Sequence, residues 1–228
     1  IPDIAIDKTL PKAIPPQPLT PAPSSNATPA TSQVIAKSAP PKPPAQKPRF
    51  IKDFPSRPGD DTFLVGQEKS DSCTLASTRM ALQKAVGLDV AESDLREMSS
   101  KIKDGYENNS NKWGTSPDTV ATLINDNYSA NARAEYHYPD SQTLDQIESA
   151  VKENKGIIVS VRNSEWLGYS AAHSVTVVDI QSDENGNQYV YVNDPWPSGQ
   201  GKKMALPAED FKRAWFGDAT YIQTVKEE

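Results

Sequence analysis

The chain has one cysteine, Cys73, and two histidines among 228 residues. A single cysteine excludes an internal disulfide, so the fold does not depend on an oxidising compartment. One thiol and two histidines far apart in the chain also do not make a zinc-binding set. We therefore expect no disulfide and no metal site.

Glycine is absent before Gly59, whereas fifteen of the twenty prolines lie in residues 1–58. Eight Lys or Arg against three Asp or Glu give residues 1–58 a net charge of about +5, and residues 59–228 carry about −11. Proline-rich sequence favours polyproline II and cannot bury enough apolar area to fold alone. We predict a disordered proline-rich arm or linker over 1–58 and one globular domain over 59–228.

Long apolar runs are also missing. No stretch approaches the ~18 residues of a membrane span, and no basic segment followed by an apolar run opens the chain as a signal peptide would. The chain begins with Ile rather than Met, so we expect a processed product or a piece of a longer protein. The acidic domain argues against nucleic acid as a partner.

Hydrophobic spacing and turn residues predict an α+β fold, with helices first and antiparallel strands second. The proline that follows Ser116 and the glycines at 87 and 156 are typical helix boundaries. Predicted helices cover 73–86, 90–102, 114–127, 141–156 and, more briefly, 206–216. Predicted strands cover 157–161, 173–180, 188–194 and 220–225, after an extended entry at 62–65 and with a hairpin turn at 183–187.

Cys73 begins the first predicted helix. Free N–H groups and the helix dipole favour a negative charge there and lower the pKa of a thiol. Of the two histidines, His173 enters a strand behind small residues and is the better base, whereas His137, in a predicted edge strand or loop, is expected to be structural. The imidazole needs an orienting group; Asp194, at the end of the returning strand, is favoured and Asn193 is the fallback.

An attacking thiolate also generates an oxyanion that requires donors. The Cys73 backbone N–H can supply one, and the side-chain amide of Gln67, six residues upstream, the second. Trp196 is expected to pack over the His173–Asp194 pair. Trp166 and Tyr169 in the loop 164–170 are candidate cleft walls. The charges at 68, 69 and 71 are interpreted as solvated loop charges.

These motifs resemble the papain-like cysteine peptidases over roughly residues 62–225. The resemblance lies in Gln67 with Cys73 opening a helix, in "AAHSVTVVDI" with His173, and in "YVYVNDPWP" with Asp194 and Trp196. Asp followed by Pro is closest to the peptidases that cleave bacteriocin leaders and to the effector proteases of plant pathogens. Two departures stand out: Thr74 replaces the tryptophan of papain, and nothing spans a membrane as the leader peptidases' transporters do.

The resemblance implies a papain-like fold in which the helix of Cys73 packs on an antiparallel sheet. It implies a cofactor-independent Cys73–His173–Asp194 peptidase that acts on a protein substrate, as a secreted or translocated bacterial effector or toxin with a host target or an immunity protein as partner. Three alternatives remain at this point. They are a glutamine deamidase or acyltransferase with the same triad, a leader-processing peptidase, and a binding module without catalysis.

Overall fold

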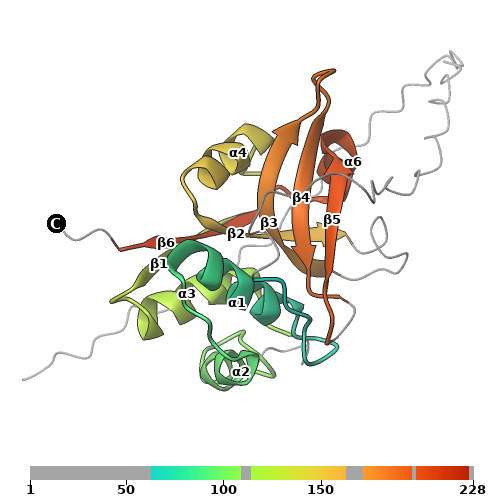
Figure 1. Cartoon of the computed structure of the whole chain (residues 1–228). Coiled ribbons are helices and arrows are strands. Elements are labelled where there is room, and N and C mark those ends of the chain that lie inside the picture. The colour runs from blue at the N-terminus through green and yellow to red at the C-terminus, as the bar shows by residue number, and fades with distance from the viewer. Residues whose placement is uncertain (1–62, 109–113, 163–171, 197–198, 226–228) are drawn as a thin grey trace, which may run out of the picture. The chain divides into compact units, whose positions relative to one another are not determined.

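The framework of the chain is a six-stranded antiparallel sheet with helices on both faces (Figure 1). The computed structural model describes residues 63–108, 114–162, 172–196 and 199–225. The predicted arm, 1–58, lies outside these residues. The elements in chain order are α1 (Cys73–Val86), α2 (Glu92–Ser100), α3 (Pro117–Asn127), β1 (Ala132–His137), α4 (Leu144–Lys152), β2 (Gly156–Arg162), β3 (Ala172–Ser182), β4 (Gln188–Asp194), β5 (Lys202–Pro207), α6 (Ala208–Ala214) and β6 (Ala219–Thr224).

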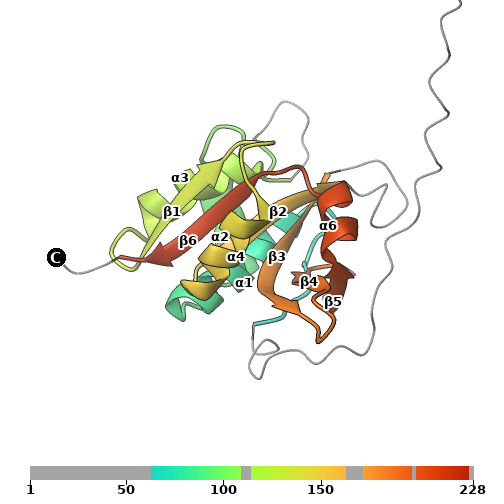
Figure 2. The same ribbon diagram turned by 90° about the horizontal axis from the view of Figure 1, so that it is seen from above.

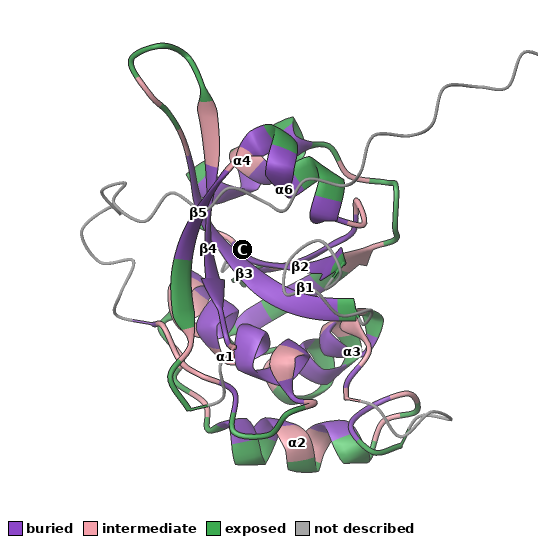
Figure 3. Ribbon diagram, turned by 90° about the vertical axis from the view of Figure 1, so that its right-hand side faces the viewer, coloured by how far each residue is buried: buried purple, intermediate pink, exposed green. Residues whose placement is uncertain are grey.

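Helices cover the sheet in two layers. In Figures 1 and 3, α1, α2 and α3 lie on one face, and α4 and α6 on the other. One apolar core joins α4 and α6 to β2, β3, β4 and β5, and a second joins α1, α2 and α3 to β1, β2 and β6. The predicted α+β class, with the Cys73 helix packed on an antiparallel sheet, is therefore confirmed.

Helix α1 is buried on several sides, unlike a surface helix (Figure 3). Leu75 and Leu82 pack in the core with α2 and α3, whereas Met80 packs with Phe63 and Tyr191 on the other side. The helix ends at Val86, and its C-cap Gly87 has a left-handed φ of 71°, which glycine adopts without the steric cost of a Cβ. Because α1 is held from several directions, its first residue has a fixed place.

The β3–β4 hairpin sets the second half of the site. Its turn is closed by the Asp183 carboxylate, which accepts the backbone N–H groups of Asn185 and Asn187. The register pairs Thr176 with Asn193, with a bulge at Val178. This register brings the end of β4 close to the start of β3.

Most predicted elements agree with the structure to within a few residues, and α1 and β4 agree at both ends. The sequence does not predict strand β5, and it predicts the segment of β1 only as an edge strand or loop around His137. Both are the outer strands of the sheet; Figure 2 shows β1 beside β6 at one end. Edge strands carry charged residues and a weak apolar alternation, which explains why their sequences give little signal.

Within the described ranges, no helix has the length and apolarity needed to cross a membrane.

Candidate active site

Cys73 is the first residue of α1 and is partly exposed. The residue before it, Ser72, is the N-cap. The Ser72 hydroxyl donates to the carbonyl of Lys69 (2.9 Å) and accepts the Lys69 N–H (3.1 Å). These two bonds close the turn that precedes the helix, so the thiol stands at the helix N-terminus on a rigid support.

Buried hydroxyl groups fix α1 against β3. The Thr74 and Ser174 hydroxyls are 2.9 Å apart, and the Ser77 hydroxyl donates to the Ser174 carbonyl at 3.0 Å. In return, the Thr176 hydroxyl donates to the Ser77 carbonyl at 3.1 Å. Buried polar atoms are costly unless paired, so these bonds select one position of α1 and bring its start beside the histidine that precedes Ser174.

His173 and Asp194 form a buried pair. Nε2 of His173 lies 2.6 Å from Oδ1 of Asp194, and the same oxygen accepts the backbone N–H of Trp196 at 2.8 Å. With Nε2 held by the carboxylate, Nδ1 is the ring nitrogen that remains for the thiol. Trp196 thus contacts the pair through its backbone.

Cys73 and His173 change each other's ionisation. Burial raises the pKa of the Cys73 thiol, but the hydrogen bond and charge of His173, with a bond from the Ser174 backbone, outweigh it and lower the pKa overall. Burial lowers the pKa of His173, but hydrogen bonds and charges of Asp194 and Cys73 raise it to about 10. Both shifts favour a thiolate beside an imidazolium over the neutral pair.

These shifts predict the pH dependence of the thiol. The Cys73 thiolate forms above the lowered pKa of the thiol, and the His173 imidazolium persists up to about pH 10. The ion pair is therefore the main form at pH values between these two pKa values. Alkylation by iodoacetamide should therefore be half-maximal below about pH 8.5, the value of a free cysteine. Alkylation for a fixed time at each pH, followed by mass spectrometry, measures the midpoint. A midpoint at or above about 8.5 would contradict the ion pair.

Gln67 is buried on the loop before α1. Its side-chain Nε2 donates to the Lys69 carbonyl at 2.6 Å, and an amide nitrogen has a second hydrogen to donate. Among the described residues, no donor reaches the buried Oε1 of Gln67. The main chain of Gln67 pairs on both sides, with the carbonyl of Pro195 and the N–H of Gly199.

The structure thus brings Cys73, His173 and Asp194 together, with Gln67 on the loop that leads to the thiol. Asn193 alternates with Asp194 along β4 and is not the partner of the imidazole. The predicted cleft walls, Trp166 and Tyr169, lie outside the described residues.

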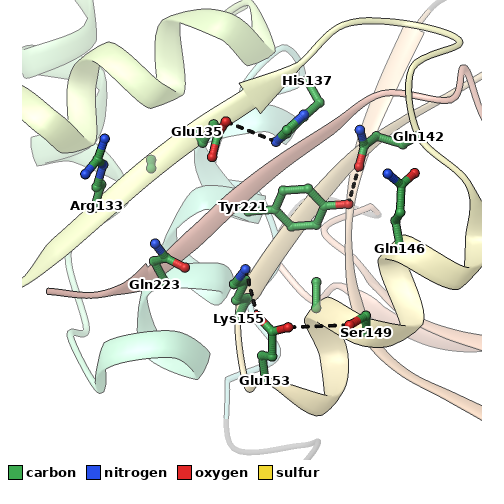
Figure 4. A pocket seen from close by; sticks show the side chains of 12 residues that line it. Arg133, Glu135, His137, Gln142, Gln146, Ser149, Glu153, Lys155, Tyr221 and Gln223 are labelled. Carbon is green, nitrogen blue, oxygen red and sulfur yellow. Dashed lines mark hydrogen bonds and ion pairs between the residues drawn. The ribbon is translucent and has the colours of Figure 1, made fainter. Parts of the chain in front are cut away.

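His137 lies apart from this site. It is on β1, and β6 and β2 separate that strand from β3, a distance of about 14 Å at the usual strand spacing. Its ring packs edge-on against Tyr221 at 5.2 Å and lies 3.6 Å from the Glu135 carboxylate. It lines a hollow between β1, β6 and α4 (Figure 4). The volume of the hollow is about 320 Å³. Cys73, His173 and Asp194 do not line that hollow.

The sequence alone does not reveal the residues that support the site. No pattern predicts the roles of Thr74 and Ser174. The only signal is a stripe of small polar residues on α1 (Thr74, Ser77 and Thr78). In the described part of the chain, no three His, Cys, Asp or Glu side chains are grouped as metal ligands would be.

A thiol at a buried helix start, beside a histidine and an acid carried on adjacent strands of an antiparallel sheet, defines a papain-like cysteine peptidase fold. The chain belongs to the Peptidase_C39 like family, whose sequence profile matches residues 60–221. Among curated proteins, none matches the chain significantly.

Several solved structures are similar to the chain. Bromelain from Ananas comosus, in complex with the inhibitor E64, is 14% identical, with 72% of this chain and 94% of that chain covered and a TM-score of 0.48. The ragweed pollen allergen Amb a 11, a cysteine protease in its proform, is 13% identical over 73% and 63% of the two chains, with a TM-score of 0.47. The Salmonella effector SpvD is 13% identical over 79% and 84%, with a TM-score of 0.33.

Proposed function

We propose that the protein is a cysteine peptidase that hydrolyses an amide bond of a protein or peptide through Cys73, His173 and Asp194. The observation that carries the proposal is the placement of one imidazole between a thiol whose pKa it lowers and a buried carboxylate 2.6 Å from its other side. Perturbed pKa values of this kind gather at sites of catalysis.

In the acylation step, the Cys73 thiolate attacks the carbonyl carbon of the scissile amide. The carbonyl oxygen becomes an oxyanion, which the Cys73 backbone N–H and the second Nε2 hydrogen of Gln67 stabilise. The imidazolium of His173 gives its proton to the leaving amine, and the C–N bond breaks. The product is a thioester on Cys73 and a neutral His173.

In the deacylation step, the neutral imidazole takes a proton from water, and the resulting hydroxide attacks the thioester carbon. The C–S bond breaks, the acid is released, and the thiolate–imidazolium pair is restored. Asp194 holds the ring through Nε2 in both steps. Its bond to the Trp196 N–H keeps the carboxylate from rotating away. None of these steps uses a cofactor.

The finer assignments are also proposals. The Asp194–Pro195 sequence at the end of β4 supports the branch of bacteriocin-leader peptidases and plant-pathogen effector proteases. Secretion or translocation as an effector or toxin, with an immunity protein or host target as partner, stays a prediction that follows from this resemblance.

Comparison of proteomes treated with the protein or with its Cys73→Ala variant tests the function. Peptide hydrolysis predicts new chain termini that depend on Cys73 and carry the mass of water. Deamidation would instead leave chains intact and raise the mass of a glutamine by about one dalton, and acyl transfer would add an amine. Either result without new termini would contradict the peptidase assignment.

A further inference from the structure

Helix α2 binds the loop between Gln67 and Cys73 through a side chain at its first residue. The carboxylate of Glu92, the first residue of α2, is 1% exposed, and its Oε2 accepts the backbone N–H of Glu68 at 2.9 Å. Its other oxygen pairs with Arg96 at 2.5 Å, and Arg96 reaches on to the Glu68 carboxylate at 2.7 Å. The carboxylate at position 68 is exposed, as expected of a solvated charge, and it also takes part in a three-residue ion network.

The hydrogen bond from the Glu68 N–H to Glu92 fixes the orientation of the peptide group between Gln67 and Glu68. The peptide that joins Gln67 to Glu68 donates its N–H to Glu92, and its carbonyl accepts the N–H of Gly199 at 2.9 Å. The preceding N–H, that of Gln67 itself, donates to the Pro195 carbonyl at 2.9 Å. The backbone on both sides of the Gln67 Cα therefore has a single orientation, and so does the direction in which the side-chain amide leaves it.

Among the residues that the structure describes, the bond to Glu92 links the backbone at Gln67 and Glu68 to α2, whereas its other two bonds lead to the segment after β4. A buried carboxylate is costly unless it is paired, and Glu92 is paired with Arg96, which is partly buried beside it. Glu97 is on the same helix, but it is exposed and pairs with Lys101 on the surface. Burial of Glu92 is thus linked to its bond with the loop.

We propose that Glu92 is a positioning residue for the oxyanion hole, acting through the Glu68 N–H to orient the Gln67 amide. The inference rests on the proposed function of Gln67 and Cys73. It adds that substrate activation depends on α2, an element that contributes no residue to the triad.

Two probes of Cys73 separate this role from general support of the fold. Acylation by p-nitrophenyl acetate passes through a tetrahedral oxyanion: the S–C bond forms, the C–O bond breaks and p-nitrophenolate leaves. Alkylation by iodoacetamide displaces iodide from carbon and forms no oxyanion. The first rate depends on the thiolate and on the oxyanion donors, the second on the thiolate alone.

Glu92→Met removes the acceptor and the charge but keeps most of the volume. Loss of a whole oxyanion donor costs about 10²–10³-fold, so a misplaced donor should slow acylation of Cys73 about tenfold. Alkylation should change less than twofold. Glu92→Gln, which retains an acceptor for the Glu68 N–H, should recover most of the acylation rate, and Glu97→Met on the exposed side of α2 should leave both rates unchanged.

The decisive comparison repeats Glu92→Met in a Gln67→Ala background. If Glu92 acts through Gln67, the second substitution should slow acylation less than twofold there. Equal losses in both backgrounds, or a parallel loss of alkylation, would overturn the proposal and indicate a purely structural residue. Should Cys73→Ala retain the burst of p-nitrophenolate, the proposed function itself would be wrong.

One measurement needs no variant. In the unmodified protein, the Glu68 amide hydrogen should exchange slowly with solvent, because it donates to a buried carboxylate. Exchange as fast as that of an exposed loop amide would refute the role of Glu92, whichever variants fold.

Discussion

Cys73→Ala should lower the rate of peptide hydrolysis by at least about 10⁴-fold, because removal of the nucleophile leaves only binding and oxyanion stabilisation. The fold should persist: the side chain is small, partly exposed and outside the apolar cores. Hydrolysis of a peptide identified by the proteomic comparison, measured beside the far-ultraviolet circular dichroism spectrum and Tm, checks both expectations.

Cys73 carries the one thiol of the chain. Any thiol reagent that inactivates the protein must act at Cys73, so inactivation and substitution should agree. Turnover in Cys73→Ala within a hundredfold of the unmodified protein, with the spectrum and Tm retained, would show that the reaction does not use the thiol.

His173→Ala should have the second large effect. The ring supplies the hydrogen bond and charge that lower the pKa of Cys73, whereas the burial that raises this pKa remains. The thiol pKa should rise to about 8.5 or higher, which leaves roughly 1% thiolate at pH 6.5. Alkylation at that pH should fall up to ~100-fold, and peptide hydrolysis further, because the proton donor for the leaving amine is also lost.

His137→Ala is the matched control, since it removes the other histidine of the chain from a strand far from the thiol. Alkylation and hydrolysis should both remain within about twofold of the unmodified protein. Alkylation at pH 6.5 that is unchanged in His173→Ala, or lowered equally in the two variants, would separate the thiol from the imidazole and remove the basis of the ion pair.

Asp194 and Gln67 illustrate two kinds of support for this pair. Asp194 is fully buried and binds the ring directly, and the Trp196 N–H donates to the same oxygen. Gln67 is held through its backbone by Pro195, Gly199 and, one residue on, by α2. Loss of Asp194 should therefore change the ionisation of the site. Loss of the backbone bonds at Gln67 should change only the placement of an oxyanion donor.

Elements whose signals are local can be predicted from the amino-acid sequence. Helix α1 ends before Gly87 because a left-handed glycine acts within one turn, and it begins at Cys73, directly after a turn that the Ser72 hydroxyl closes through Lys69. Strand β4 follows a turn closed by Asp183, three residues from Gly186. The alternation of residues along β4 is also enough to favour Asp194 over Asn193, because side chains two apart share a face.

Contacts between distant segments depend on the tertiary structure and have no such signal. Thr74 meets Ser174 a hundred residues away, and Glu92 meets the backbone of Glu68 from another helix. A hydroxyl or a carboxylate looks the same in a sequence whether water or a buried partner satisfies it, so neither contact has a local pattern. The edge strands β1 and β5 are obscured for a related reason: their pairing depends on the position of β6 and β4, and their own residues are partly charged.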